Sequence, residues 1–423
     1  MSPEVISILA LVAMFVLATL LPINIGVMAF VAAFLVGITV GDMDGDTILD
    51  GFPGGLAVTL IGITYLFAIA TNNGTIDWLV RVATVSVRGR LVALPWVMFL
   101  IAGVLTAFGA VSPAAVAIIA PVALGFAYKY DINPLLMGIM VVHGAQAGGF
   151  SPISIYGTIT NDIVAQTDLP ASPLTLFLAS LFFNLAIAIV GFIIFGGRDL
   201  LSRRTDVRAE AAAEEPDAED AGTIRPTPYQ LFTLVGLVGL GIATLVFELD
   251  VGLVALTVAL VLVLVSPHEQ KSAVSQISWP VVLLIAGVLT YVAVLEEIGT
   301  IDYVSNNVAD LGSAMLASLL LCYVGAVVSA FASSTALLGA IIPLAVPFLL
   351  AGEVGAVGVI AALAVSSTVV DVSPFSTNGA LVLANAHEDD RDRVYKQLLT
   401  FGFAIVLIAP PVAWAVLIVP GWL

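Results

Sequence analysis

The feature of this sequence that most restricts its fold is a series of long apolar segments that runs from one end of the chain to the other. Hydrophobic residues make up 60% and charged residues 10% of the 423 positions. A soluble domain has roughly 45–50% apolar and about 25% charged residues. Segments of about 17–25 apolar residues are long enough to cross a hydrocarbon core of about 30 Å. We therefore predict an all-α polytopic membrane protein, embedded in a lipid bilayer, without a sizeable soluble domain.

Proline, glycine and charged residues divide these apolar segments into two similar series. In the first half, residues 1–196, the predicted spans are 3–20, 24–41 and 56–73, followed by a doubled apolar stretch at 93–127 and by spans at 134–165 and 173–196. A polar linker at 197–226 follows and is expected to be cytoplasmic. In the second half, residues 227–423, the series repeats at 228–247, 251–266 and 280–297, with a doubled stretch at 313–351 and spans at 354–386 and 397–419.

Each doubled stretch is interrupted in its middle by small polar residues. These are Ser112-Pro113 in the first half and Ser333-Ser334-Thr335 in the second, and neither lies in a basic loop that would mark a crossing. We interpret the stretches as re-entrant helical hairpins. Irregular backbone at membrane depth is tolerated only where protein or a water-filled cavity satisfies its polar groups. Both tips are therefore expected at the centre of the protein, Ser112 near the break in 134–165 and Ser334 near the break in 354–386.

The positions of the basic residues predict the orientation, because Lys and Arg collect in short cytoplasmic loops. If the amino terminus lies outside, all 13 Lys and Arg residues fall on the inner side, while the outer loops carry acids such as Asp44 and Glu296. This distribution predicts a multi-pass protein of the inner (plasma) membrane with both termini outside.

The two halves are predicted to form an inverted repeat, because an odd number of crossings in each half gives them opposite orientations. Ser151-Pro152 recurs as Ser373-Pro374 at a spacing of 222 residues, and Pro121 and Pro343 keep the same spacing. Gly157 and Gly379 keep it as well. Matches in the same order at a constant spacing indicate a repeat rather than chance.

Two spans at matching positions of the halves cannot be smooth helices. Glycine and proline interrupt the first at 148–158 and the second at 371–379. Interrupted helices at equivalent positions indicate a transport site, because half-helix amino termini attract anions and unwound carbonyls hold cations. The alternative is that proline and glycine only kink packed helices. We favour the transport site because both kinks coincide with hydroxyl-rich hairpins.

Neutral hydroxyl and amide side chains gather at these breaks and tips. Such groups suit a carboxylate and a hard cation such as sodium. Each hydroxyl taken alone is better explained by a bond to its own helix backbone or to a neighbouring helix, so only their clustering points to a site. The substrate ligands predicted from this clustering are Ser112, Ser151, Ser154, Ser334, Thr335, Ser373, Ser376, Thr377 and Asn378.

Two ionisable residues, His143 and Asp371, lie at membrane depth next to the breaks, whereas no Lys or Arg lies inside a span. Charge inside a membrane is costly and marks function. Asp371 is predicted to couple transport to sodium ions or protons. His143 is a second candidate for coupling, although a neutral imidazole also packs in a helix bundle at little cost.

The arrangement of two five-span halves, each with a hairpin followed by a broken helix, resembles the ion transporter superfamily. That superfamily includes the divalent anion/sodium symporters and the MatC-like dicarboxylate carriers. Gly157-Thr158-Ile159-Thr160-Asn161 is similar to the Gly-Thr-Pro-Pro-Asn-like turn of the symporters but lacks the prolines. The segment Leu21-Pro22-Ile23-Asn24-Ile25-Gly26 looks most like the MatC-type branch.

The resemblance implies a secondary active transporter of small organic anions, C3/C4 dicarboxylates in particular, coupled to Na⁺ or H⁺. It implies an elevator-like alternating-access mechanism and a homodimer. It adds Thr158 to the expected substrate ligands. The sodium ligands that it implies are Ser112, Gly149, Asn161, Ser334, Asp371 and Asn378.

Two other classes of protein compete with the secondary transporter. The first is the large membrane subunit of a tripartite binding-protein-dependent carboxylate transporter, which needs a small membrane subunit and a periplasmic binding protein. The second is a membrane-embedded enzyme, but the sequence contains no His-Glu-x-x-His helix, Gly-x-Ser-x-Gly elbow or phosphate loop. No organic cofactor and no nucleic-acid partner are expected. The single cysteine, Cys322, excludes an internal disulfide.

Overall fold

The computed structural model describes residues 2–21, 23–86, 90–201, 203, 225–267, 270–300, 303, 314–330, 334–350 and 354–421. In these ranges the chain forms helices joined by short loops. Six of the described helices are at least 18 residues long and apolar enough to cross a membrane. The prediction of an all-α polytopic membrane protein is therefore confirmed.

The helices of the first half follow the apolar segments closely. They are α1 (Pro3–Leu20), α2 (Ile25–Thr39), α3 (Gly45–Asp50), α4 (Gly54–Asn72), α5 (Thr75–Ser86), α6 (Ala93–Ala107), α7 (Ser112–Lys129), α8 (Pro134–Gly148), α9 (Ile155–Ala165), α10 (Pro173–Ile194) and the 3₁₀ turn η1 (Asp199–Leu201). The short helices α3 and α5 were not predicted, because neither contains an apolar run long enough to cross a membrane. Asp44 caps the amino end of α3: its carboxylate accepts bonds from the N–H and hydroxyl of Thr47, and these bonds lower the pKa of Asp44.

The second half contains α12 (Pro228–Leu245), α13 (Val251–Val265), α14 (Gln270–Ser275), α15 (Trp279–Glu297), α17 (Ala314–Ser329), α18 (Ser334–Leu350), α19 (Ala356–Thr368), α20 (Thr377–Ala384) and α21 (Glu388–Leu417). Its spans also match the apolar segments, apart from the unpredicted six-residue α14. Ser333 of the predicted hairpin tip lies outside the described residues.

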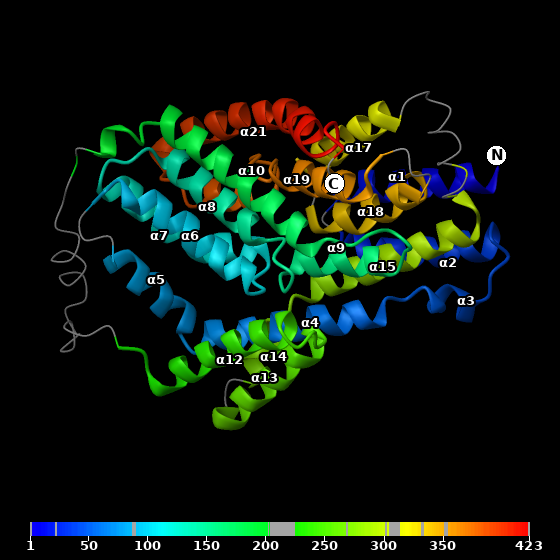
Figure 1. Cartoon of the computed structure of the whole chain (residues 1–423), viewed down its shortest axis with the longest axis horizontal. Coiled ribbons are helices and arrows are strands. Elements are labelled where there is room, and N and C mark those ends of the chain that lie inside the picture. Colours follow the sequence, from blue (N-terminus) through cyan, green and yellow to red (C-terminus); the bar gives the residue numbers. More distant parts are fainter. Residues whose placement is uncertain are drawn as a thin grey trace.

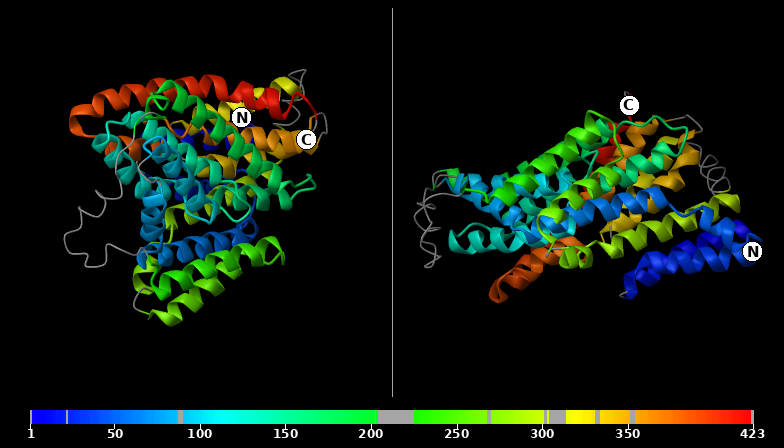
Figure 2. Two further views of the ribbon diagram at one scale, coloured as in Figure 1. Left: turned by 60° about the vertical axis from the view of Figure 1, so that its left-hand side comes forward. Right: turned by 90° about the horizontal axis from the view of Figure 1, so that it is seen from below.

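The helices separate into two bundles that run side by side (Figures 1 and 2). We name the group α1–α4 with α12–α15 the frame bundle, in which α2 packs on α15 and α4 on α13. We name the group α6–α10 with α17–α21 the core bundle, in which α8 packs on α6, α7 and α10, and α19 packs on α10, α17 and α21. The main contacts between the bundles are those of α15 with α18 and of α4 with α9, and α5 links α4 to α6.

The interruptions in the chain all lie in the core bundle. The chain reverses between α6 and α7 at Gly109, which has a φ of +109°, a value that favours glycine. It is unwound between α8 and α9 at 149–154 and between α19 and α20 at 369–376. Helix α20 of the second half packs on α7, and α18 packs on α9 of the first half. Each hairpin therefore contacts the broken helix of the other half. Two points stay predictions: that the hairpins enter and leave the bilayer on the same side, and that the two halves have opposite orientations in it.

A close crossing of α2 and α15 holds the frame bundle together. A Cβ atom on Gly287 would lie 2.0 Å from the carbonyl oxygen of Gly26, so both helices need glycine there. We expect Gly287→Ala to cost about 1–3 kcal/mol through overpacking, and to lower the melting temperature of the purified protein. Gly239→Ala on α12 is the matched control, because nothing lies within 4 Å of a Cβ at that position. Equal melting temperatures for the two variants would show that the crossing is not tight.

Candidate functional site

A group of buried polar side chains connects the two breaks and both hairpins at the middle of the core bundle. The amide nitrogen of Asn378 donates to the hydroxyl of Ser112 at 2.8 Å and to Oδ2 of Asp371 at 3.0 Å. The amide nitrogen of Gln146 donates to the same Oδ2 at 2.7 Å. Ser334 also lies near Asp371. Ser112 therefore lies close to the second break as well, not only to the first as the sequence predicts.

A tyrosine completes this group from the first half. Tyr156, the second residue of α9, lies near the side chains of Thr335, Gln146 and Ser112. We name the assembled set of buried side chains the central cluster. Its members are Ser112, Gln146, Tyr156, Ser334, Thr335, Asp371 and Asn378.

The two breaks have the same backbone structure. In the first, the hydroxyl of Ser154 donates to the carbonyls of Gly149 and Ser151 and caps α9 by accepting from the N–H of Gly157 at 3.2 Å. In the second, Ser376 makes the equivalent bonds to the carbonyls of Asp371 and Ser373 and accepts from Gly379 at 3.3 Å.

Three residues after each capping serine, a glycine allows two backbone segments to approach each other closely. A Cβ atom on Gly157 would lie 2.0 Å from the carbonyl oxygen of Ser151, and one on Gly379 would lie 2.0 Å from that of Ser373. Any side chain at either position would therefore displace the turn. Gly157 and Gly379 are 222 residues apart, the spacing that indicates the repeat. The repeat in the sequence therefore corresponds to a turn that occurs once in each half.

Several oxygens of the site have no hydrogen-bond partner among the described residues. They are Asp371 Oδ1, Asn378 Oδ1, Gln146 Oε1 and Thr158 Oγ1, all buried. Buried polar atoms are usually paired, and an unpaired acceptor is costly, so a group of them indicates a missing partner. Oxygens of this kind are the ligands that hard cations prefer.

His143 belongs to a chain of bonds behind the cluster. The amide nitrogen of Asn184 on α10 donates to the carbonyl of Ser180 at 2.9 Å, so the amide oxygen of Asn184 accepts from Nδ1 of His143 at 2.8 Å. The hydroxyl of Ser180 in turn donates to the carbonyl of Gln146 at 3.0 Å. His143 therefore supports the helix that presents Gln146, and the described contacts do not join it to Asp371 directly.

The other predicted ligands have varied surroundings. Ser151 and Ser373 are buried within the two breaks. Ser154 and Ser376 are also buried, but their hydroxyls are used in the turns, as is the carbonyl of Gly149. Two predicted ligands are less enclosed than the rest, since Thr377 is exposed and Asn161 is half-buried on α9.

Gln146 and Tyr156 were missed by the analysis of the sequence. Gln146 follows His143 by three residues in a span that is otherwise apolar, and this is a signal of a polar contact at depth. Tyr156 stands 222 residues before Asn378, so the repeat itself marks it.

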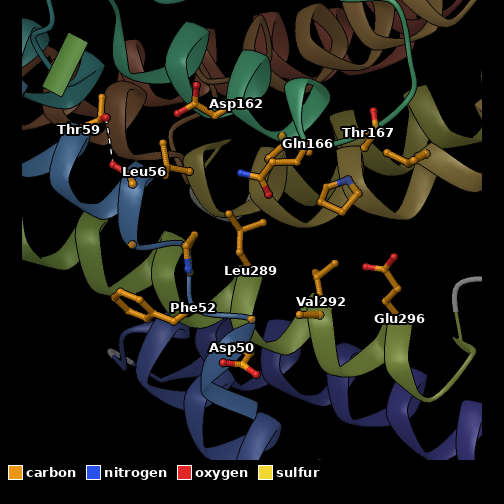
Figure 3. A pocket seen from close by; sticks show the side chains of 18 of the residues that line it. Asp50, Phe52, Leu56, Thr59, Asp162, Gln166, Thr167, Leu289, Val292 and Glu296 are labelled. Atoms are coloured by element: carbon orange, nitrogen blue, oxygen red, sulfur yellow. Dashed lines mark hydrogen bonds between the residues drawn. The ribbon is translucent and has the colours of Figure 1, made fainter. Parts of the chain in front are cut away.

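A cavity of about 700 Å³ opens between the two bundles. In Figure 3, Asp162 of α9 and Gln166, which follows α9, face Asp50, Leu289 and Glu296 of the frame bundle across it. Its lining includes four carboxylates, those of Asp50, Asp162, Asp250 and Glu296, and no Lys or Arg. Asp162 lies one helical turn beyond Thr158 on the same face of α9. The helix that passes the central cluster therefore continues into this cavity.

A second, smaller cavity of about 240 Å³ also lies between the bundles. Its walls are α4, the α14–α15 loop with Gln276 and Ser278, and the tip of the first hairpin at Gly109 and Val111. The boundary between the bundles is thus hollowed at two places, one beside each hairpin.

Comparisons with known proteins agree with this architecture. Residues 1–149 match the family described as dicarboxylate carrier protein MatC N-terminus. The structure of the YdaH transporter of Alcanivorax borkumensis, described as having an unusual topology, superimposes with a TM-score of 0.58 at 14% sequence identity and covers 98% of both chains. No curated protein sequence matches the chain.

The fold and these comparisons support a multi-pass membrane protein of the transporter class, not an enzyme. Within that class, the predicted resemblance to the MatC-like dicarboxylate carriers is confirmed, and the matched residues 1–149 include the first hairpin and helix α8 of the site.

Proposed function

We propose that the protein is a secondary active transporter of small organic anions, C3/C4 dicarboxylates in particular, coupled to sodium ions or protons. The observation that carries this proposal is the convergence of four helix amino termini on the central cluster. Helices α7 and α18 begin at cluster residues Ser112 and Ser334, and α9 and α20 each have a cluster residue in second place. Each helix amino terminus carries about half a positive charge and free N–H donors, so the four together suit a dianion.

A cation must accompany the anion, because the cluster also contains the buried carboxylate of Asp371 and no basic side chain. A dianion next to an uncompensated carboxylate would be strongly repelled in a low-dielectric environment. The unpaired oxygens around Asp371 offer a place for a cation. The acidic cavity between the bundles would raise the local concentration of cations at one approach to the site.

We propose alternating access by movement of the core bundle against the frame bundle, as in an elevator. The support for this is that hairpins and breaks all belong to the core bundle, while its contacts with the frame are concentrated on α15, α18, α4 and α9. A fixed frame is needed for such a movement, and we propose that two copies of the frame bundle associate as a homodimer.

Uptake into proteoliposomes tests the transport proposal. The purified chain should accumulate C3 or C4 dicarboxylates when a sodium or proton gradient is imposed, and should equilibrate them without a gradient. A monocarboxylate of the same length is the control and should not accumulate. The tripartite alternative is favoured if uptake requires a periplasmic binding protein and a small membrane subunit. Failure with every dicarboxylate under both gradients, with and without those two additional proteins, would contradict both forms of the proposal.

We propose that the protein lies in the inner (plasma) membrane with both termini outside. The carboxyl end of α7, whose last turn contains Lys129, and the amino end of α21 lie at the end of the molecule opposite α3 with its acids (Figure 1). In a variant whose native Cys322 is replaced, a cysteine at Asp44 should react with an impermeant reagent in intact cells, and one at Arg203 should not. The reverse labelling pattern would refute the topology.

A further inference from the structure

We propose that the transport site holds a single sodium ion, bound by Asp371, Asn378 and Gln146, and that the equivalent position in the first half holds none because Tyr156 fills it. This inference deepens the proposed function and rests on it. It concerns the identity and the number of the coupling ions, which the resemblance to known carriers leaves open.

The arrangement of the two amide groups favours a metal ion over a proton. Gln146 and Asn378 both turn their nitrogens toward Oδ2 of Asp371, and this leaves both amide oxygens and Oδ1 without a partner among the described residues. A proton on Oδ1 would donate one hydrogen bond and satisfy one amide oxygen. The other would remain unpaired at a cost of about 1–3 kcal/mol. A sodium ion takes several oxygen ligands at once, so its coordination shell has room for all three of these oxygens.

The charge of this set fits one monovalent ion. The three side chains contribute one formal negative charge, from Asp371, so one sodium ion brings the set to neutrality. The dianion then faces four helix amino termini of about half a positive charge each, roughly two in total. A second sodium ion would leave the loaded site with an excess of positive charge.

The repeat shows why the first half lacks a matching site. At the 222-residue spacing, Gly149 corresponds to Asp371 and Tyr156 corresponds to Asn378. The carbonyls of Gly149 and Asp371 accept the same two bonds, from a serine hydroxyl and a glycine N–H, so the backbones are equivalent. The side chains are not, because the first half has neither the carboxylate nor the amide.

Tyr156 occupies the space that a side chain at position 149 would need. A Cβ atom on Gly149 would lie 2.9 Å from Cδ2 of the Tyr156 ring, which is closer than real contacts allow. The ring itself is buried, 2% exposed, and packs against Phe150 with their centroids 5.5 Å apart. The tyrosine therefore closes one of two equivalent positions and leaves the chain with one ion site.

Equilibrium binding of radioactive sodium to the purified full-length protein, without any dicarboxylate, tests the inference. We expect one ion for each chain and a Hill coefficient near 1. Asp371→Asn should remove the binding, and Gln146→Leu should weaken it at least tenfold, with melting temperatures near that of the wild type. Asp46→Asn, in the exposed first turn of α3 and outside the acidic cavity, also removes a carboxylate; it is the matched control and should still bind one ion.

Two ions for each chain, no sodium binding, or unchanged binding in Asp371→Asn would overturn the inference. These results are separable from the proposed function, because proton-driven dicarboxylate uptake would survive the loss of sodium binding. The double variant Gly149→Asp with Tyr156→Asn gives the first half the same two side chains that the second half has at Asp371 and Asn378. This double variant should bind two ions. A folded double variant that binds one ion would show that Tyr156 is not what closes the first position.

Discussion

Asp371→Asn is expected to abolish the accumulation of substrate against its gradient while leaving the exchange of internal for external substrate intact. Net accumulation requires an ion that binds and leaves with the substrate, and Asp371 is the carboxylate of the central cluster. Its replacement by a neutral amide removes the charge that attracts the cation. Exchange needs no net ion movement, so it requires only that the loaded site still reorients.

The substitution should leave the fold intact because asparagine is nearly the same shape as aspartate. Its amide oxygen can accept the bonds that Gln146 and Asn378 now donate to Oδ2. We expect the accumulation ratio in proteoliposomes under a sodium gradient to fall to about one, with exchange within a few-fold of wild type. Asp46→Asn on α3, which also removes a carboxylate, should continue to accumulate substrate. If Asp371→Asn concentrates substrate with unchanged dependence on sodium and pH, Asp371 has a structural role.

The helices of this fold could be predicted from the sequence because a bilayer imposes a length on every span. The interruptions could be predicted because proline and glycine break helices wherever they occur. Helices α5 and α14 could not, because a helix of 12 or six residues has no apolar run of spanning length. The division into two bundles also required the structure, since it depends on which faces of the helices pack together.

Part of the site was predictable for a related reason, namely that a polar residue inside a span is conspicuous. Asp371, Asn378 and Ser112 were identified on this basis, and the structure brings them together. Ser154 was identified by residue type as well, but its hydroxyl is committed to its own turn. Tyr156 was not identified, because a tyrosine in a span is usually a packing or interface residue.

A covalent link between the two bundles is expected to stop transport almost completely. Val292 on α15 of the frame bundle and Val346 on α18 of the core bundle line the same cavity, so cysteines at both positions face a common space. If the core bundle moves against the frame, a short bifunctional thiol reagent that joins them will hold one conformation. The native Cys322 is buried in α17 and should be replaced first so that it does not react.

The matched control is a pair of cysteines that lie within one bundle. Tyr128 of α7 and His387 at the start of α21 stack with ring centroids 3.6 Å apart, and both belong to the core bundle. A link between these two positions does not join the moving parts. We expect initial uptake to fall at least tenfold for the linked Val292–Val346 pair, to recover when a cleavable linker is reduced, and to change little for the linked Tyr128–His387 pair. Normal transport by a fully linked Val292–Val346 protein would exclude sliding of the bundles at this boundary and would require that the hairpin tips alone open and close the site.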